Sequence, residues 1–353
     1  MPRSSIVCVI LACWLSAAAC GRNHAAERAS TAAPDGSQPS QYLDYSGRDD
    51  ALAGGVKMIP ITTPKGTFRV WTKRVGNNPR VKVLLLHGGP AATHEYFEAF
   101  DSYLPRAGYE YYYYDQLGSA YSDQPKEPSL WQIPRFVDEV EQVRKALGLT
   151  NDNFYLLGQS WGGILATEYA LAHQDNLKGL IVSNMMASIP AYNDYAHKVL
   201  MPQMDPKALA EILALEAKKQ YGSPRYEELL VPFYTTHILR MPADQWPDPV
   251  NRAFAHINRS IYVPMQGPSE MGASGVLEKW DRFADLKRIT VPTLVIGARY
   301  DTMDPAYMER MSKELPKGRY LYCPNGSHLA MYDDQKTYFD GLTKFIADVD
   351  AGR

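Results

Sequence analysis

The stretch Gly158-Gln159-Ser160-Trp161-Gly162-Gly163 is the most informative part of this chain about its fold. It follows an apolar run, Phe154 to Leu157, and opens a segment of helical character, Gly162 to His173. In a G-x-S-x-G pattern at a strand-to-helix junction, the serine takes strained backbone angles and the flanking glycines avoid a steric clash. Ser160 is therefore predicted to project above a sheet at a helix N-terminus, where the helix dipole favours developing negative charge.

A serine hydroxyl is a weak nucleophile, so Ser160 needs a histidine base and a carboxylate that orients the base. His328 lies in a loop of small residues after a late apolar run, Arg319 to Cys323. Asp301 follows the preceding apolar run and is predicted to be the orienting acid. Asp304 remains the alternative, because turn geometry can bring either carboxylate within reach of the base.

The stretch His87-Gly88-Gly89-Pro90 comes directly after another apolar run, Val81 to Leu86. A glycine-rich loop in this place supplies a backbone N–H group to an oxyanion hole, together with the residue after the nucleophile. We therefore predict that the N–H groups of Gly89 and Trp161 form the oxyanion hole. His87 is interpreted as a structural hydrogen-bonding residue rather than a catalytic one.

Short apolar runs alternate with helical segments over most of the chain. The first two runs, Val56 to Thr62 and Thr67 to Val75, are joined by Lys65-Gly66 and predict a hairpin. Later runs are continuously apolar, as in strands covered on both faces, so we predict an α/β fold with a mostly parallel, doubly wound sheet. The other predicted strands are Val81 to Leu86, Tyr109 to Tyr114, Phe154 to Leu157, Leu180 to Ser183, Thr293 to Ile296 and Arg319 to Cys323, and the predicted helices include Val137 to Leu147, Gly162 to His173 and Thr337 to Val349.

The alternation stops between residues 187 and 283, where helical periodicity and many prolines occur without a strand-like run. This region is predicted to be a helical cap inserted over the strand ends. Residues 42–186 and 284–353 then form the predicted α/β-hydrolase core. Residues 1–41 are predicted to be a signal peptide followed by a flexible tether, because the stretch after residue 20 is rich in Ala, Ser and Pro without periodicity.

The N-terminal segment predicts export. Arg3 precedes an apolar stretch, Ile6 to Leu15, that is too short to span a bilayer. Small residues, Ala17-Ala18-Ala19, then precede Cys20, which resembles a bacterial lipoprotein box as well as an ordinary cleavage site. The tether after Cys20 favours lipidation, so the protein is expected in the periplasm or anchored to a membrane only through Cys20.

Composition excludes several classes of partner. Lys and Arg total 37 against 39 Asp and Glu, and this near-neutral balance predicts no binding of nucleic acid. Three of the four cysteines lie in the targeting segment, which excludes a disulfide framework and a thiolate metal site in the body. The remaining one, Cys323, is predicted to be a buried structural thiol. No metal or organic cofactor is expected, since no cluster shows ligand spacing.

Several stretches of the body occur together in one known family. They are His87 to Pro90, Asp115 to Ser122, Gly158 to Gly163, Trp246-Pro247, Met265 to Glu270, Gly297 to Asp301 and Gly326 to His328. With these stretches the chain resembles the proline iminopeptidases of the α/β-hydrolase superfamily over nearly its whole length after about residue 45. The resemblance implies release of an N-terminal residue, often proline, from a small peptide or amino-acid amide.

The resemblance also implies a site for the free amine of the substrate. Family members hold this amine with carboxylates, and Glu270 matches one of them. A second glutamate directly follows the triad aspartate in some members, but Thr302 stands there in this chain. Selection for a charged amine should therefore be weaker, unless Asp304 or Glu95 substitutes. Ala91 stands where the family usually has a glycine after His-Gly-Gly-Pro.

These features lead to one main hypothesis and two alternatives. The main hypothesis is an exported aminopeptidase or amino-acid amidase, in which Ser160 forms an acyl-enzyme with the help of His328 and Asp301. An esterase or lactonase with the same triad and a neutral pocket is the first alternative, which Thr302 and Ala91 permit. A non-catalytic binding protein of the cell envelope is the second, and the intact set of triad residues argues against it.

Overall fold

The computed structural model describes residues 39–353. The predicted signal peptide, with Cys20, and most of the predicted tether lie outside the described residues. The first described element is the one-turn helix α1 (Pro39–Tyr42), whose Tyr42 hydroxyl donates a hydrogen bond to the carbonyl oxygen of Tyr109 at 2.9 Å. The last residues of the predicted tether, from Pro39 on, therefore lie within the described structure.

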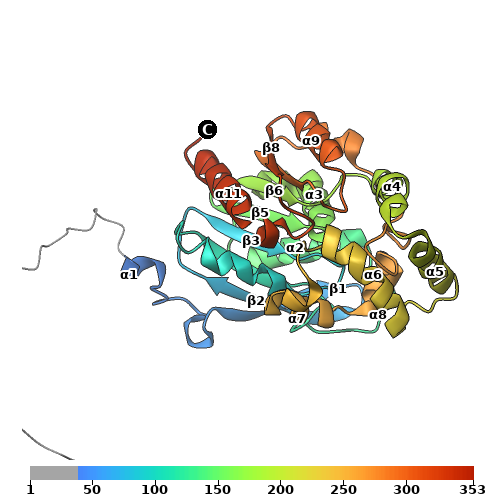
Figure 1. Cartoon of the computed structure of the whole chain (residues 1–353). Helices are drawn as coiled ribbons and strands as arrows, with labels where there is room; N and C mark the ends of the chain where they lie inside the picture. Colours follow the sequence, from blue (N-terminus) through green and yellow to red (C-terminus); the bar gives the residue numbers. More distant parts are fainter. Residues whose placement is uncertain (1–38) are drawn as a thin grey trace, which may run out of the picture. The chain divides into compact units, whose positions relative to one another are not determined.

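Eight strands form one sheet in the order β1-β2-β4-β3-β5-β6-β7-β8 (Figure 1). The predicted hairpin is formed by β1 (Val56–Thr63) and β2 (Gly66–Val75), and β2 also pairs antiparallel with β4 (Glu110–Asp115). All other neighbouring strands are parallel, which confirms the predicted α/β fold with a mostly parallel sheet. The remaining strands are β3 (Lys82–Leu86), β5 (Phe154–Gln159), β6 (Gly179–Ser183), β7 (Thr293–Ala298) and β8 (Gly318–Cys323).

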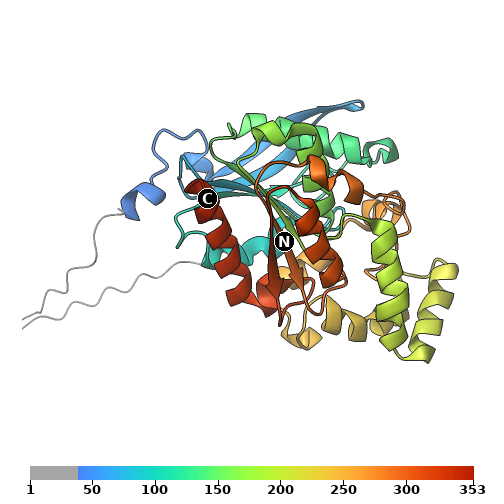
Figure 2. The same ribbon diagram turned by 90° about the horizontal axis from the view of Figure 1, so that it is seen from above.

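Neighbouring side chains of the central strands pack on opposite faces of the sheet. Val83 and Leu84, for example, are both fully buried but belong to different hydrophobic clusters. Figure 2 accordingly shows helices on both sides of the sheet, with α11 in red on one side and α2 and α3 in green on the other. The Leu84 face is covered by α2 (Ile133–Ala146), α3 (Trp161–His173) and α9 (Pro305–Glu314), and the Val83 face by η2 (His94–Ser102) and α11 (Gln335–Asp350).

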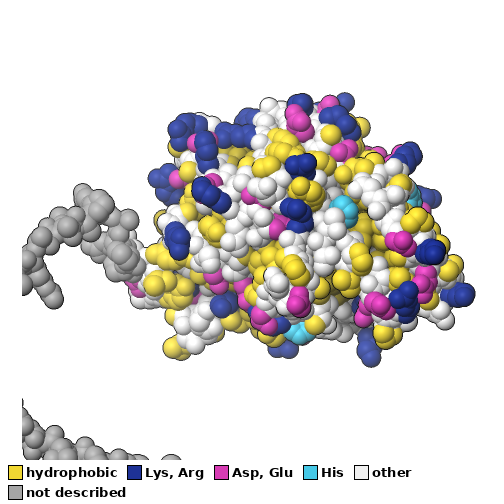
Figure 3. Space-filling model, viewed as in Figure 1, with side chains coloured by type: hydrophobic (Ala, Val, Ile, Leu, Met, Phe, Trp, Pro, Cys, Tyr) yellow, Lys and Arg dark blue, Asp and Glu magenta, His cyan; other side chains and the backbone are white. Residues whose placement is uncertain are grey.

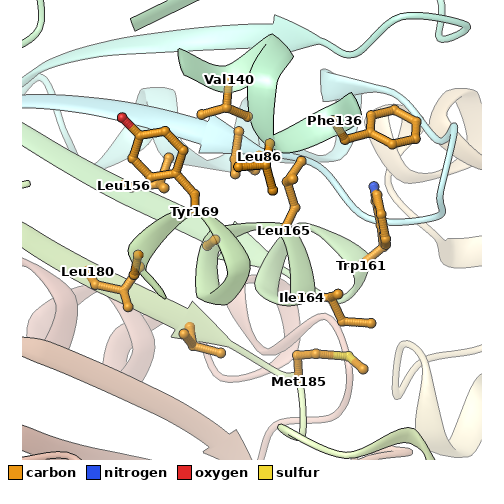
Figure 4. Packing of buried hydrophobic residues seen from close by; sticks show 14 of the residues in the cluster. Leu86, Phe136, Val140, Leu156, Trp161, Ile164, Leu165, Tyr169, Leu180 and Met185 are labelled. Atoms are coloured by element: carbon orange, nitrogen blue, oxygen red, sulfur yellow. The ribbon is translucent and has the colours of Figure 1, made fainter. Parts of the chain in front are cut away.

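Helix α3 is apolar around most of its circumference because it lies between the sheet and α2. Figure 4 shows Leu165 of this helix pointing toward Leu86 of β3, with Phe136 and Val140 of α2 beyond it. All four side chains are buried in the same cluster. The packing holds the N-terminus of α3 firmly against the ends of the central strands.

Between β6 and β7 the described chain forms helices and adds no strand to the sheet. These helices have a small hydrophobic cluster of their own, which includes Ile212, Tyr226 and Phe233. They are also joined to the core, since the N–H group of Leu329 donates to the carbonyl oxygen of Ile238 at 2.9 Å. The helices are α4 (Ile189–Tyr195), the π-helical η5 (Ala196–Leu200), α5 (Pro206–Ala217), α6 (Pro224–His237), α7 (Asp248–Ala255) and α8 (Arg259–Met265).

The described surface carries charges of both signs. On the face seen in Figure 3, basic and acidic side chains are intermixed rather than gathered into one patch. In residues 39–353, no helix combines the length and the apolar character needed to cross a membrane. The short helices not named above are η1 (Ala51–Ala53), η3 (Pro128–Leu130), η4 (Gln174–Asn176), η6 (Met201–Gln203), η7 (Ala243–Gln245), η8 (Phe283–Arg288) and α10 (Ala330–Asp333).

The packing of α3 predicts how the free energy of unfolding responds to substitutions in this helix. Leu165→Ala removes fully buried atoms and leaves a cavity between the sheet and α2, so the free energy of unfolding should fall by about 2–5 kcal/mol. The same exchange at Leu213, which is 46% exposed on α5, should change it by less than about 0.5 kcal/mol. Urea unfolding followed by circular dichroism measures both variants, and equal losses would contradict this account of the core.

Candidate active site

Ser160 lies on a sharp turn between β5 and α3, with φ 56° and ψ −128°. The turn requires glycine on both sides. A Cβ atom on Gly158 would lie 1.9 Å from the carbonyl oxygen of Gly162, and one on Gly162 would lie 2.0 Å from that of Leu86. The N–H group of Ser160 donates to the carbonyl oxygen of Ser183 at 3.1 Å. Contacts with two neighbouring strands thus hold the serine in its strained conformation.

His328 and Asp301 come together from the loops after β8 and β7. Nδ1 of His328 and Oδ1 of Asp301 are 2.8 Å apart, and Asp301 is fully buried. The other carboxylate oxygen accepts a hydrogen bond from Nδ2 of Asn184 at 2.7 Å, which fixes its orientation. Because an ionised carboxylate only accepts, Nδ1 carries the proton. Nε2 is therefore the atom available for proton transfer.

The alternative acid, Asp304, has a different role. Its Oδ1 accepts a hydrogen bond from the N–H group of Ala306 at 2.9 Å, so it is the N-cap of α9. The structure brings Asp301 to His328 and leaves Asp304 at the helix start. Thr302 is fully buried, with its hydroxyl oxygen 3.3 Å from Nδ1 of His328 and 3.4 Å from Oδ1 of Asp301.

Ser160 and His328 line one cavity. Among the described residues no hydrogen bond joins the Ser160 hydroxyl to the imidazole, a bond that in many hydrolases tightens only when substrate binds. Burial favours the neutral imidazole, but the nearby carboxylates of Asp301, Glu270 and Asp333 outweigh it and raise the pKa of His328. The arrangement can therefore take a proton from the serine and stabilise the imidazolium that forms.

Of the two predicted oxyanion donors, Gly89 lines the same cavity as Ser160, and Trp161 directly follows Ser160 in the chain. Gly89 lines the cavity with φ 110°, and a Cβ atom there would lie 2.5 Å from the backbone nitrogen of Ala92. Trp161 is the first residue of α3, where backbone N–H groups have no acceptor within the helix. Ala91 has φ 57°, a left-handed conformation that favours the glycine that the resemblance implies at this position.

A buried chain of hydrogen bonds joins the three catalytic loops. The hydroxyl of Tyr96 accepts from the N–H group of Gly88 at 2.7 Å and donates to Oε1 of Gln159 at 2.9 Å. Nε2 of Gln159 then donates to the carbonyl oxygen of His328 at 3.0 Å. Sequence reasoning missed Tyr96 and Gln159. The only signal was the place of Gln159, directly before the nucleophile.

His87 has the structural role expected from its position. Its Nε2 accepts a hydrogen bond from the N–H group of Gln116 at 3.1 Å, so Nδ1 carries the proton and donates to the carbonyl oxygen of Gly88 at 2.9 Å. Burial lowers the pKa of His87 to about 4, which keeps the ring neutral. Oε1 of Gln116 accepts from Nε1 of Trp161 at 2.8 Å, and the loop after β3 is thereby tied to α3.

Glu270 brings a carboxylate into the same cavity. The hydroxyl of Tyr262 donates to its Oε1 at 2.5 Å. The backbone is held as well, since the hydroxyl of Tyr192 donates to the Glu270 carbonyl oxygen at 2.7 Å and the Glu270 N–H donates to the hydroxyl of Tyr234 at 3.3 Å. Burial raises the pKa of Glu270, while the charge of His328 opposes this shift. Within residues 39–353, Glu270 forms no ion pair with Lys or Arg, so its carboxylate depends on the Tyr262 hydroxyl and on the nearby imidazole of His328.

Neither predicted substitute for the second family glutamate reaches the cavity. Glu95 is buried elsewhere, where its carboxylate pairs with Arg252 at 2.7 Å and with Nδ1 of His256 at 2.8 Å. Asp304 caps α9, as described above. Within residues 39–353, Glu270 is consequently the one carboxylate that lines the cavity. The rest of the wall is largely apolar and includes Ile238, Ala253, Phe254, Ile257 and Leu329.

The described residues contain neither a metal site nor a reactive cysteine. Residues 39–353 contain no group of three His, Cys, Asp or Glu side chains placed to hold a metal ion. Cys323 is fully buried among apolar side chains, and burial raises the pKa of its thiol. The thiolate needed for nucleophilic attack is therefore disfavoured there.

Comparison with known proteins extends over most of the chain. Residues 82–335 match the family model described as the alpha/beta hydrolase fold. The chain is 64% identical over 293 residues to the proline iminopeptidase of Flavobacterium johnsoniae, a match that covers 83% of this chain and 98% of that protein. The crystal structure of VinJ is similar with a TM-score of 0.77 and 29% identity, over 83% of this chain and 99% of that chain. The proline iminopeptidase of Mycobacterium smegmatis is similar with a TM-score of 0.74 and 25% identity, over 84% of this chain and 99% of that chain.

The contrast between the two aspartates is testable with a fluorophosphonate probe, which labels activated serines. Asp301→Asn should slow labelling by about 10⁴-fold, because the imidazole loses its carboxylate partner. Asp304→Asn should leave the rate unchanged, since asparagine caps a helix as well as aspartate does. Ser160→Ala should abolish labelling. The assignment of the acid would be wrong if Asp304→Asn were the slower of the two variants.

Proposed function

Because this chain belongs to the proline iminopeptidase family of the α/β hydrolases, we propose that it releases the N-terminal residue from short peptides and amino-acid amides through an acyl-enzyme. The chain is a serine-hydrolase-type enzyme of the aminopeptidase kind. The observation that carries the proposal for this chain is Glu270, a lone carboxylate in an apolar cavity with Ser160 and His328.

Glu270 is suited to bind the free amine of the substrate. An ammonium group that enters an apolar cavity loses its hydration and needs a counter-charge and hydrogen-bond acceptors. The carboxylate supplies both, and the hydrogen bond from Tyr262 to Oε1 leaves Oε2 for the amine. An N-terminal residue held in this way has its carbonyl group within the cavity that Ser160 lines.

The reaction then follows from the positions of the other groups. Nε2 of His328 takes the hydroxyl proton of Ser160 while the serine oxygen attacks the carbonyl carbon. The N–H groups of Gly89 and Trp161 donate to the oxygen that becomes negatively charged. When the C–N bond breaks, His328 gives its proton to the leaving nitrogen. Water, activated by the same imidazole, then releases the N-terminal residue from the acyl-enzyme.

Export and anchoring belong to the same proposal and are supported by the sequence. The apolar stretch Ile6 to Leu15, after Arg3, has the features of a secretory signal, and Ala17-Ala18-Ala19 precedes Cys20. A lipid chain on Cys20 would leave residues 21–38 between the anchor and the first described residue. The substrates would then be peptides in the cell envelope.

Selection for a free amine is measured with prolyl and alanyl arylamides beside their N-acetylated forms and a neutral aryl ester. The wild type should strongly prefer the free amines. Glu270→Gln should lower kcat/KM for them by about 10²-fold or more, because the ammonium group loses its counter-charge. Glu278→Gln, at an exposed position further along the cap, is the matched control and should behave like the wild type. Equal cleavage of blocked and free substrates, unaffected by Glu270→Gln, would support the esterase or lactonase alternative instead.

Anchoring is measured by fractionating bacteria that express the full chain. The wild type should sediment with membranes and be released by detergent, because a covalent lipid holds it there. Cys20→Ser should lose the detergent-releasable membrane form. A wild-type protein found wholly in the cytosol would contradict export, and one that stays soluble in the periplasm would contradict the lipid anchor alone.

A further inference from the structure

A second cavity adjoins the catalytic one, and the two share Phe254 and Ile257 as lining residues. The second, which we call the outer cavity, is walled mainly by α6 and by the segment from Trp246 to Arg259, which includes α7. Figure 1 shows α6, α7 and α8 grouped near one another. Its wall is aromatic, since the ring of Phe254 lies 5.4 Å from that of Trp246 and 6.2 Å from that of Tyr234.

Helix α8 contributes one lining residue to each cavity. Tyr262 lines the catalytic cavity and donates to Glu270, whereas Arg259, three residues earlier, lines the outer cavity. Residues three apart lie on the same face of a helix, about 4.5 Å apart along its axis. The outer cavity therefore holds a positive charge about one helical turn from the tyrosine that orients the catalytic-cavity carboxylate.

The guanidinium of Arg259 has no carboxylate partner among the described residues. Its Nη2 donates to the carbonyl oxygen of Tyr221 at 3.0 Å, and Glu227 lines the same cavity without an ion pair to it. Arg225, on the same cap, shows the usual situation, since it pairs with Glu211 at 2.7 Å. A guanidinium presents five N–H donors in a planar fork, so Arg259 keeps donors for a planar anion.

The polarity of an aminopeptidase substrate indicates which anion this is. The amino end of the peptide stops at Glu270, so every residue beyond the scissile bond must leave the catalytic cavity. We propose that the outer cavity binds the leaving part of a short peptide and that Arg259 pairs with its C-terminal carboxylate. This inference rests on the proposed aminopeptidase function. The aromatic wall formed by Tyr234, Trp246 and Phe254 favours an apolar side chain in the leaving part.

The expected effect is modest, because Arg259 is exposed and ion pairs between exposed groups are weak. A short peptide with a free carboxylate should have a kcat/KM roughly five-fold above that of its C-terminal amide, mainly through KM. The ratio should fall as salt is raised, since salt screens exposed charges.

The test compares Pro-Leu-Gly with its C-terminal amide and with a prolyl arylamide. Arg259→Gln should bring the ratio of acid to amide close to one and leave the arylamide rate unchanged. Arg259→Lys should keep part of the ratio, because the charge remains but the planar fork is lost. Arg225→Gln, also on the cap, is the control and should keep the full ratio.

The outcomes separate this inference from the proposed function. If Arg259→Gln kept the wild-type ratio while the arylamide was cleaved normally, the carboxylate site would be wrong and the aminopeptidase function would stand. A wild-type ratio near one would overturn it in the same way. If the wild type cleaved neither the peptide nor the arylamide, the proposed function itself would fail.

Discussion

The close approach of α3 to the central strands is the constraint on which the site depends. A Cβ atom on Gly158 would clash with the carbonyl oxygen of Gly162, and one on Gly162 would clash with that of Leu86, so neither position has room for a side chain. This contact forces Ser160 into backbone angles that cost about 1–3 kcal/mol for a residue other than glycine. The packing of α3 between the sheet and α2 offsets that cost, because the helix cannot withdraw without exposing buried apolar surface.

Three segments that are distant in the sequence meet at this turn. The oxyanion loop, the nucleophile turn and the histidine loop come from three separate parts of the chain, and the hydroxyl of Tyr96 and the amide of Gln159 bridge them. Each donor and acceptor in this bridge is buried, so breaking one hydrogen bond would leave polar groups unsatisfied. A buried polar chain of this kind gives the loops one mutual arrangement rather than several.

The fold class and the membership of the proline iminopeptidase family could both be predicted from the sequence, and both predictions are confirmed. The central strands could be predicted because a continuous apolar run indicates a strand that is buried on both faces. The sequence favours Asp301 as the acid but does not exclude Asp304, although Asp304 precedes a proline, as N-cap residues often do. The pairing of Glu95 with Arg252 was not readable, because it depends on how α7 packs against η2. Such long-range polar contacts follow from the assembled fold and leave no local pattern.

Thr302 stands where the family resemblance implies a second glutamate, so the proposed amine site has a single carboxylate, Glu270, whose charge also acts on the base. Glu270 helps to raise the pKa of His328, and a positively charged imidazole lowers the pKa of Glu270 in return. A substrate ammonium group bound at Glu270 offsets the carboxylate, so the pKa of His328 falls when an amine is in place. Under the proposed function, a substrate with a free amine would therefore favour the neutral imidazole, which is the form that takes the proton of Ser160. Under the proposed function, the single carboxylate of Glu270 would thus both select the free amine and favour the neutral form of the base.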